Sequence, residues 1–164
     1  MSLKIVTIDT KYCDYLRRFD FRVPYNMNEK EKRPFIGVLF EIKNLKYFAP
    51  MSSPKKKHLT MKNTLDFFKI DSGKLGAINF NNMIPVIDGV YEFIDLYGLD
   101  GNNNEKYLNL LNNQLYNIRR KENVILNKAL NLYNNYLYGK LPENIRNRCV
   151  DFIILEQHSK EYKN

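Results

Sequence analysis

FIGVLFEIKNLKYFA, residues 35–49, is the segment from which the architecture of this chain follows. Two apolar runs, rich in β-branched and aromatic residues, lie on either side of a short polar turn. Runs of this composition, joined by such a turn, are typical of a β-hairpin. The segment therefore predicts a strand over 35–42 and a returning strand over 46–49, with Asn44 and Leu45 in the turn.

Further strands are predicted on both sides of this hairpin. Their ranges are 3–8, 67–70, 75–80 and 84–87, with 91–96 as an edge strand. Ahead of the hairpin, Thr10 is placed to cap a helix with an apolar face at helical spacing, made of Tyr12, Tyr15, Leu16 and Phe19. The polar residues 20–33 are predicted to form a loop.

The pattern changes after Gly101, where apolar residues recur at helical spacing. Helical stripes are predicted over 107–118 and 125–137, and Gly139 ends the second. Pro142 opens a new helix with a buried face of Ile145, Cys149, Phe152 and Ile153. Strands first and helices afterwards indicate an α+β fold, with a compact, strongly bent antiparallel β core or small barrel and a helical C-terminal third. We expect one domain spanning residues 1–164.

Charge is concentrated in one part of the chain. The net charge is +8, and residues 29–69 hold ten basic and four acidic side chains, so +6 of that charge lies there. Such a concentration favours a polyanionic partner through local potential and counterion release. A solvated basic surface is the alternative reading of charge alone.

The cysteine and histidine pattern predicts no metal site. Cys13 and Cys149 lie far apart on apolar helical stripes, and neither His58 nor His158 is close to a cysteine. We expect both thiols to pack in the core of a protein from a reducing compartment. No signal-peptide core and no apolar run of transmembrane length occur, so we expect a cytoplasmic protein with no membrane partner.

KYFAPMSSPKKKH, residues 46–58, has the clearest chemical character. A short apolar strand runs into Ser52 and Ser53, then into Pro54 and Lys55. Loop hydroxyls can bind the non-bridging oxygens of a phosphate, and Lys55 can neutralise a developing phosphorane. No nucleophile elbow or Gly-rich lead-in is present, which argues against a serine hydrolase or a nucleotide-binding loop. An exposed basic turn after a hairpin remains the alternative.

Three more side chains are candidates for proton transfer or phosphate orientation. His58 has an ordinary pKa near neutrality, which the preceding lysines would lower if they lie close to it. Tyr12 and Arg33 are candidates as well, with a buried tyrosine and a surface arginine as the alternatives. Aromatic side chains near the basic segment are candidates to stack on unpaired RNA bases, with packing in the core as the alternative. These residues are Tyr25, Tyr47, Phe67 and Phe68.

The order of these motifs resembles the ToxN/AbiQ family, the endoribonuclease toxins of type III toxin–antitoxin systems. The matching motifs are Lys11-Tyr12, Val23-Pro24, RPFIGV at 33–38, YFAPMSSPKKKH at 47–58, LGAIN at 75–79 and MIP at 83–85. The resemblance is clear over about residues 4–87, and the run 49–56 is its most specific part. The helical remainder is similar in general character only.

This resemblance implies a bent antiparallel β core like that of the MazF/Kid toxins, decorated by helices. It implies RNA cleavage without a metal or other cofactor, in a system of phage abortive infection in the bacterial cytoplasm. The implied inhibitor is a repeated, pseudoknotted antitoxin RNA that the toxin itself processes, and the implied substrate is cellular or phage mRNA. Toxin and antitoxin RNA are expected to alternate in a closed hetero-oligomer.

The resemblance also places the catalytic serine at Ser53 and the catalytic lysine at Lys55, with Tyr12 and Arg33 at two further family positions. Ser52 stands where some members carry threonine, and His58 remains a candidate. RNA contacts are predicted for Lys11, Lys30, Lys32, Lys46, Lys56, Lys57, Lys62, Lys69 and Phe68. A non-catalytic basic module that binds RNA or DNA is the alternative function.

Overall fold

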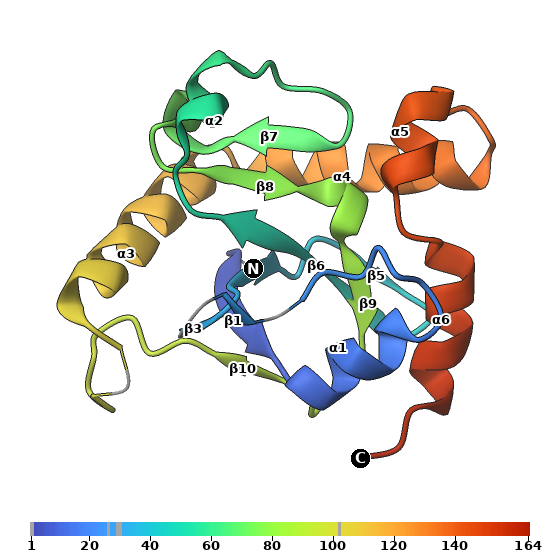
Figure 1. Ribbon diagram of the computed structural model, residues 1–164, viewed down its shortest axis with the longest axis horizontal. Coiled ribbons are helices and arrows are strands. Elements are labelled where there is room, and N and C mark those ends of the chain that lie inside the picture. The colour runs from blue at the N-terminus through green and yellow to red at the C-terminus, as the bar shows by residue number, and fades with distance from the viewer. Residues whose placement is uncertain (1, 26, 29–30, 102) are drawn as a thin grey trace.

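Strand β6 (Leu45–Ser52) is the centre of the sheet in the computed structural model, which describes residues 2–25, 27–28, 31–101 and 103–164 (Figure 1). Its first half pairs with β5 (Glu41–Ile42) and β9 (Ile84–Val86), and its second half pairs with β4 (Phe35–Gly37) and β8 (Ala77–Asn79). This strand therefore exchanges its partners along its length, as expected in a strongly bent sheet. Most β6 residues are buried, as expected of a strand covered on both faces.

Within the described residues, this sheet has eight antiparallel strands. Its main path runs β10 (Tyr91–Phe93), β1 (Lys4–Ile8), β4, β6, β8 and β7 (Phe67–Lys69). A separate hairpin joins β2 (Met27–Asn28) to β3 (Glu31–Lys32). β10 lies at one end of the path, as predicted for an edge strand. The predicted α+β class, a bent antiparallel core followed by helices, is confirmed.

Helices surround this sheet. Their bounds are α1 (Thr10–Arg17), α2 (Lys56–Thr60), α3 (Glu105–Arg120), α4 (Glu122–Leu137), α5 (Glu143–Arg148) and α6 (Phe152–Glu161), with short 3₁₀ turns η1 (Ile70–Gly73) and η2 (Phe80–Asn82). Figure 1 shows α3 along one flank of the sheet, α4 behind β8, and α6 beside α1. No helix in the described ranges is both long enough and apolar enough to cross a membrane.

Several local predictions for the first half need correction. The helix cap is Asp9 and not Thr10, because the Asp9 carboxylate accepts a hydrogen bond from the backbone N–H of Lys11. The hairpin turn consists of Lys43 and Asn44, both with positive φ, so Leu45 already belongs to β6. The predicted strand 35–42 divides into β4 and β5, and the predicted loop 20–33 contains the β2–β3 hairpin.

The last predicted helix also divides. Asp151 accepts hydrogen bonds from the backbone N–H groups of Ile153 and Ile154 and so starts α6 as a separate helix after α5. This new start turns Ile153 outward, leaving it 57% exposed rather than buried. Cys149 lies in the connection and is buried, as is Cys13, so the prediction of two core thiols is confirmed.

A buried carboxylate ties the helices to the β core. Glu156 of α6 accepts hydrogen bonds from the hydroxyls of Tyr47 on β6 (2.7 Å) and Tyr133 on α4 (2.6 Å). A charged group taken out of water must be satisfied by such donors. The predicted stacking candidate Tyr47 is therefore a core residue.

Candidate functional site

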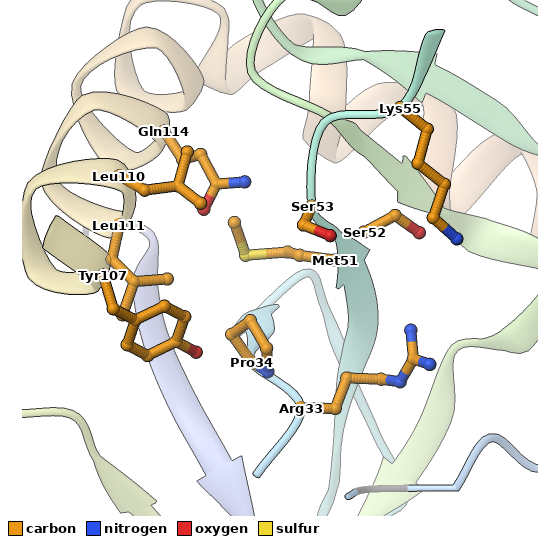
Figure 2. A pocket seen from close by; sticks show the side chains of 10 residues that line it. All are labelled: Arg33, Pro34, Met51, Ser52, Ser53, Lys55, Tyr107, Leu110, Leu111 and Gln114. Carbon is orange, nitrogen blue, oxygen red and sulfur yellow. The ribbon is translucent and has the colours of Figure 1, made fainter. Parts of the chain in front are cut away.

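A hollow of about 390 Å³ lies where β6 ends (Figure 2). The loop after β6 and the segment before β4 form one wall, and α3 forms the other. The lining residues are Arg33, Pro34, Met51, Ser52, Ser53, Lys55, Tyr107, Leu110, Leu111 and Gln114. Four of the six predicted catalytic residues, Arg33, Ser52, Ser53 and Lys55, are brought together here.

The two serines stand at the last residue of β6 and just beyond it. Ser52 pairs with Ala77 of β8, and its Oγ accepts a hydrogen bond of 2.9 Å from the side-chain amide of Asn79. Since that bond uses Ser52 as an acceptor, its own O–H is left to donate into the hollow. Ser53 is exposed, and its hydroxyl has no partner among the described residues. Both hydroxyls can therefore donate to a phosphate oxygen.

Two glycines allow this loop to pack closely against the chain that follows. Gly76 has a φ of +95°, and a Cβ there would lie 2.0 Å from the carbonyl oxygen of Ser52. Gly73 has a φ of +93°, and a Cβ there would lie 2.3 Å from the carbonyl oxygen of His58. Only glycine combines such a φ with such an approach. The sequence between η1 and β8 thus sets the position of the serine pair.

His58 lies outside the hollow and fixes the backbone of Lys55. The backbone N–H of His58 donates to the Lys55 carbonyl (3.0 Å), and the ring Nδ1 of His58 accepts from the backbone N–H of Lys55 (3.2 Å). Burial, followed by the nearby charges of Lys57 and Lys55, lowers the pKa of His58 from its usual 6.5, as the sequence predicted. A neutral ring is the form that accepts at Nδ1. His58 is therefore placed to hold the lysine rather than to exchange protons with a ligand.

Arg33 brings a second positive charge to the hollow. Its Nε donates to the carbonyl of Tyr25 (3.0 Å), which holds the side chain along the wall. Partial burial lowers the pKa of Arg33, but a guanidinium remains charged at neutral pH. Figure 2 shows the ends of Arg33 and Lys55 on the Ser52 side of the hollow, facing away from α3.

The α3 wall was not predicted as part of the site. Gln114 is buried, and its Nε2 donates to the carbonyl of Leu75 (2.8 Å), which fixes the orientation of the amide. Tyr107, Leu110 and Leu111 add apolar surface on the same wall. The sequence showed Tyr107 and Leu111 only as part of a helical stripe. Asn79 was likewise visible only as part of the LGAIN motif.

Tyr12 lies away from the hollow. Its side chain is fully buried, and its hydroxyl donates to the carbonyl of Pro85 (2.6 Å) and lies 2.9 Å from Ser159 Oγ. Burial raises the pKa of Tyr12 well above its ordinary value. These contacts are those of a buried tyrosine, the alternative to a role for Tyr12 in proton transfer or phosphate orientation.

The predicted RNA contacts are spread over the surface. Phe68 and Lys69 line a second hollow with Arg120 and Lys121, and Lys62 lines a third. Lys46 is paired with Asp88 (2.6 Å). The exposed lysines among them are Lys11, Lys32, Lys56, Lys57 and Lys62, and Lys30 lies outside the described residues. Phe67, a stacking candidate, is buried.

Two hydroxyl side chains and two cationic side chains line the first hollow, and none of the lining residues that the structure describes is acidic. Donors and cations set around one point stabilise the negative charge that develops on a phosphorane. The fold and the site therefore indicate a protein that binds a phosphate group, such as the phosphodiester of a nucleic acid.

Comparison with known proteins narrows this class to one family. The family described as "Toxin ToxN, type III toxin-antitoxin system" matches residues 4–160. Endoribonuclease ToxN of Bacillus thuringiensis subsp. kurstaki is 32% identical over 164 residues, covering 98% of this chain and 84% of that protein. Endoribonuclease ToxN of Pectobacterium atrosepticum is 34% identical over 168 residues, covering 98% and 94%. The chain belongs to the ToxN toxin family, which confirms the resemblance seen in its motifs.

A solved structure agrees over the whole length. It comes from work on "selective toxin inhibition by a non-coding RNA pseudoknot" in bacterial type III toxin–antitoxin systems. It is 30% identical to this chain with a TM-score of 0.84, and the match covers 100% of this chain and 99% of that one. The likeness therefore includes the C-terminal helices, which the motifs alone did not reach.

Proposed function

We propose that this protein is an endoribonuclease toxin of a type III toxin–antitoxin system, and that it cleaves single-stranded RNA in the hollow at the end of β6. The observation that carries this proposal is the convergence of Ser52, Ser53, Lys55 and Arg33 on one cavity. The names of the relatives, both endoribonuclease ToxN, supply the reaction class.

The reaction proposed is a transesterification within the RNA strand. The 2′-hydroxyl attacks the adjacent phosphorus, and the bond to the 5′-oxygen of the next nucleotide breaks. The products are a 2′,3′-cyclic phosphate and a 5′-hydroxyl end. Nucleophile and electrophile belong to the same strand, so the protein must mainly align them and stabilise the charge between them.

The roles of the side chains follow from their positions. Lys55 and Arg33 place positive charge beside the non-bridging oxygens, where negative charge grows in the transition state. Ser53 donates a hydrogen bond to the phosphate or relays a proton, and Ser52, held by Asn79, adds a second donor. His58 acts through the backbone of Lys55, and Tyr12 acts in packing.

The antitoxin proposed is a repeated RNA pseudoknot that this toxin processes and that then fills the same hollow. The work on the solved relative supports an RNA pseudoknot as the partner, since it describes selective toxin inhibition by a non-coding RNA pseudoknot. Cellular or phage mRNA is the substrate, and toxin and RNA form a closed assembly. One domain of residues 1–164 carries these functions, and its location is the bacterial cytoplasm, where these RNAs are made.

Incubation of labelled single-stranded RNA with the purified protein in EDTA tests this proposal. We expect discrete products that end in a 2′,3′-cyclic phosphate, and none at a position carrying a single 2′-deoxy substitution. A basic module without catalysis would bind the RNA, lose affinity steeply with salt and leave it intact. Cleavage at the 2′-deoxy position would contradict the reaction proposed.

A further inference from the structure

Tyr25 is an exposed aromatic side chain held in a fixed place. The residue is 69% exposed, although the guanidinium of Arg17 lies 3.9 Å from the ring centroid and covers one face. Arg17 also donates to the carbonyls of Val23 (3.2 Å) and Pro24 (3.0 Å). One arginine thus fixes both the backbone of this segment and the orientation of the ring.

The same segment is tied to the proposed cleavage site. Arg33, which lines the hollow with the two serines and Lys55, donates its Nε–H to the carbonyl of Tyr25. Two arginines therefore bind three consecutive carbonyls, and the second belongs to the site. The bond from Arg33 places the backbone of Tyr25 next to a side chain of the hollow, while Arg17 orders the exposed ring on the same segment.

The other aromatic candidates do not offer such a surface. Tyr47 and Phe67 are buried, and Phe68 is partly buried in a different hollow. Tyr107 lines the hollow itself, on the opposite wall. Among the aromatic rings that the sequence marked for stacking, Tyr25 is thus the exposed one that is linked to a site residue.

We propose that Tyr25 is a stacking platform for one unpaired base of the RNA strand, next to the phosphate held by Ser52, Ser53 and Lys55. A ring already ordered by Arg17 loses little conformational entropy when a base stacks on it. Stacking accepts any base, because every base has a π face. Tyr25 would therefore select single-stranded RNA over duplex, in which the bases are already stacked and paired. This inference rests on the proposed function.

A short RNA from around a cleavage site mapped with the wild-type protein serves as the probe. It carries a 2′-deoxy nucleotide at the cleaved position, so that it binds without reacting, and 2-aminopurine beside that position. We expect wild-type protein to quench the 2-aminopurine fluorescence by stacking. Tyr25→Ala should abolish the quenching and weaken binding about tenfold, within the range of one base stacked on an aromatic side chain.

Two further variants isolate the ring as the cause. Tyr25→Phe keeps the π face and should restore most of the binding and quenching. Tyr138→Ala is the matched control, because Tyr138 is 73% exposed with Lys140 near its ring, and it lies at the end of α4. We expect this control to bind as the wild type does. Equal melting temperatures for all variants would show that each one is folded.

Tyr25→Ala protein that binds within about twofold of wild type and still quenches the probe would overturn the stacking proposal. So would a Tyr25→Phe variant as weak as Tyr25→Ala, since the ring face would not be the cause. Either result leaves cleavage by the wild type intact and so spares the proposed function. A wild-type protein that cleaves no RNA would overturn both.

Discussion

At the scale of single residues, the hydrogen bonds of His58 and Tyr12 give these side chains roles other than the proton transfer that their residue types suggest. His58 is the obvious acid or base near the serines, yet its Nδ1 is engaged by the backbone of Lys55. Tyr12 is a second plausible proton donor, yet it is buried and bonded to Pro85. In both cases the hydrogen-bond partner, rather than the residue type, determines what the side chain can do.

The lowered pKa of His58 predicts a particular loss of stability on acidification. The unfolded chain takes up a proton near pH 6.5, while the folded protein keeps His58 neutral to a lower pH. The contribution of neutral His58 to the free energy of unfolding is therefore complete above pH 6.5 and is lost as the pH falls through the lower pKa of the folded state. Each pH unit between the two pKa values is worth about 1.4 kcal/mol.

Thermal unfolding between pH 7.5 and pH 5 measures this effect. We expect the melting temperature to fall less in His58→Asn than in wild type, because asparagine keeps an acceptor but does not titrate. His158→Asn, which keeps His58, is the control and should retain the part of the decrease that His58 causes. The carboxyl pKa values of Asp20 and Asp66 are lowered from their usual 3.8, so their effect on stability changes only below the pH range of this experiment. If the melting temperature of His58→Asn fell with pH as steeply as that of the wild type, His58 would not be the source of this pH dependence.

At the scale of elements, the connection from η1 to β8 holds the serine loop in place. Gly76 approaches the backbone of Ser52, and Gly73 approaches that of His58. The two ends of the segment 52–58 are therefore positioned by one short stretch of chain. The sequence shows both glycines, but only the fold shows which backbone each one touches.

Gly76→Ala should reduce both stability and cleavage. The positive φ alone costs roughly 1–2 kcal/mol for a residue with a Cβ. The added methyl group would also displace Ser52 and Ser53 from the hollow. Gly139→Ala is the matched control, because Gly139 has a φ of +68° and no atom lies within 4 Å of the added Cβ. In the control, urea unfolding should show only the loss of stability that the positive φ causes, and the cleavage rate should be normal. Normal cleavage by folded Gly76→Ala would refute this role.

At the scale of the whole molecule, the features that depend on residues close in sequence could be predicted, and those that depend on contacts between distant segments could not. Alternating and helical patterns located most strands and the long C-terminal helices, because these patterns reflect local burial. The serine–lysine loop was found from its composition. The wall formed by Gln114 was not found, because α3 reaches the loop only through tertiary packing. The burial of Tyr12 against Pro85 and Ser159 depends on contacts of the same long-range kind.

Cleavage by a Ser53→Ala variant is the most direct measurement of the proposed mechanism. The wild type and the variant are incubated with the same single-stranded RNA in EDTA, and the rate at one mapped site is compared at saturating protein. We expect Ser53→Ala to cleave at least about 100-fold more slowly while still binding the RNA, as for loss of one donor or proton-transfer group. Ser2→Ala, at an exposed serine away from the hollow, should cleave at the wild-type rate. Cleavage by Ser53→Ala at the wild-type rate and site would contradict the placement of the chemistry in this hollow.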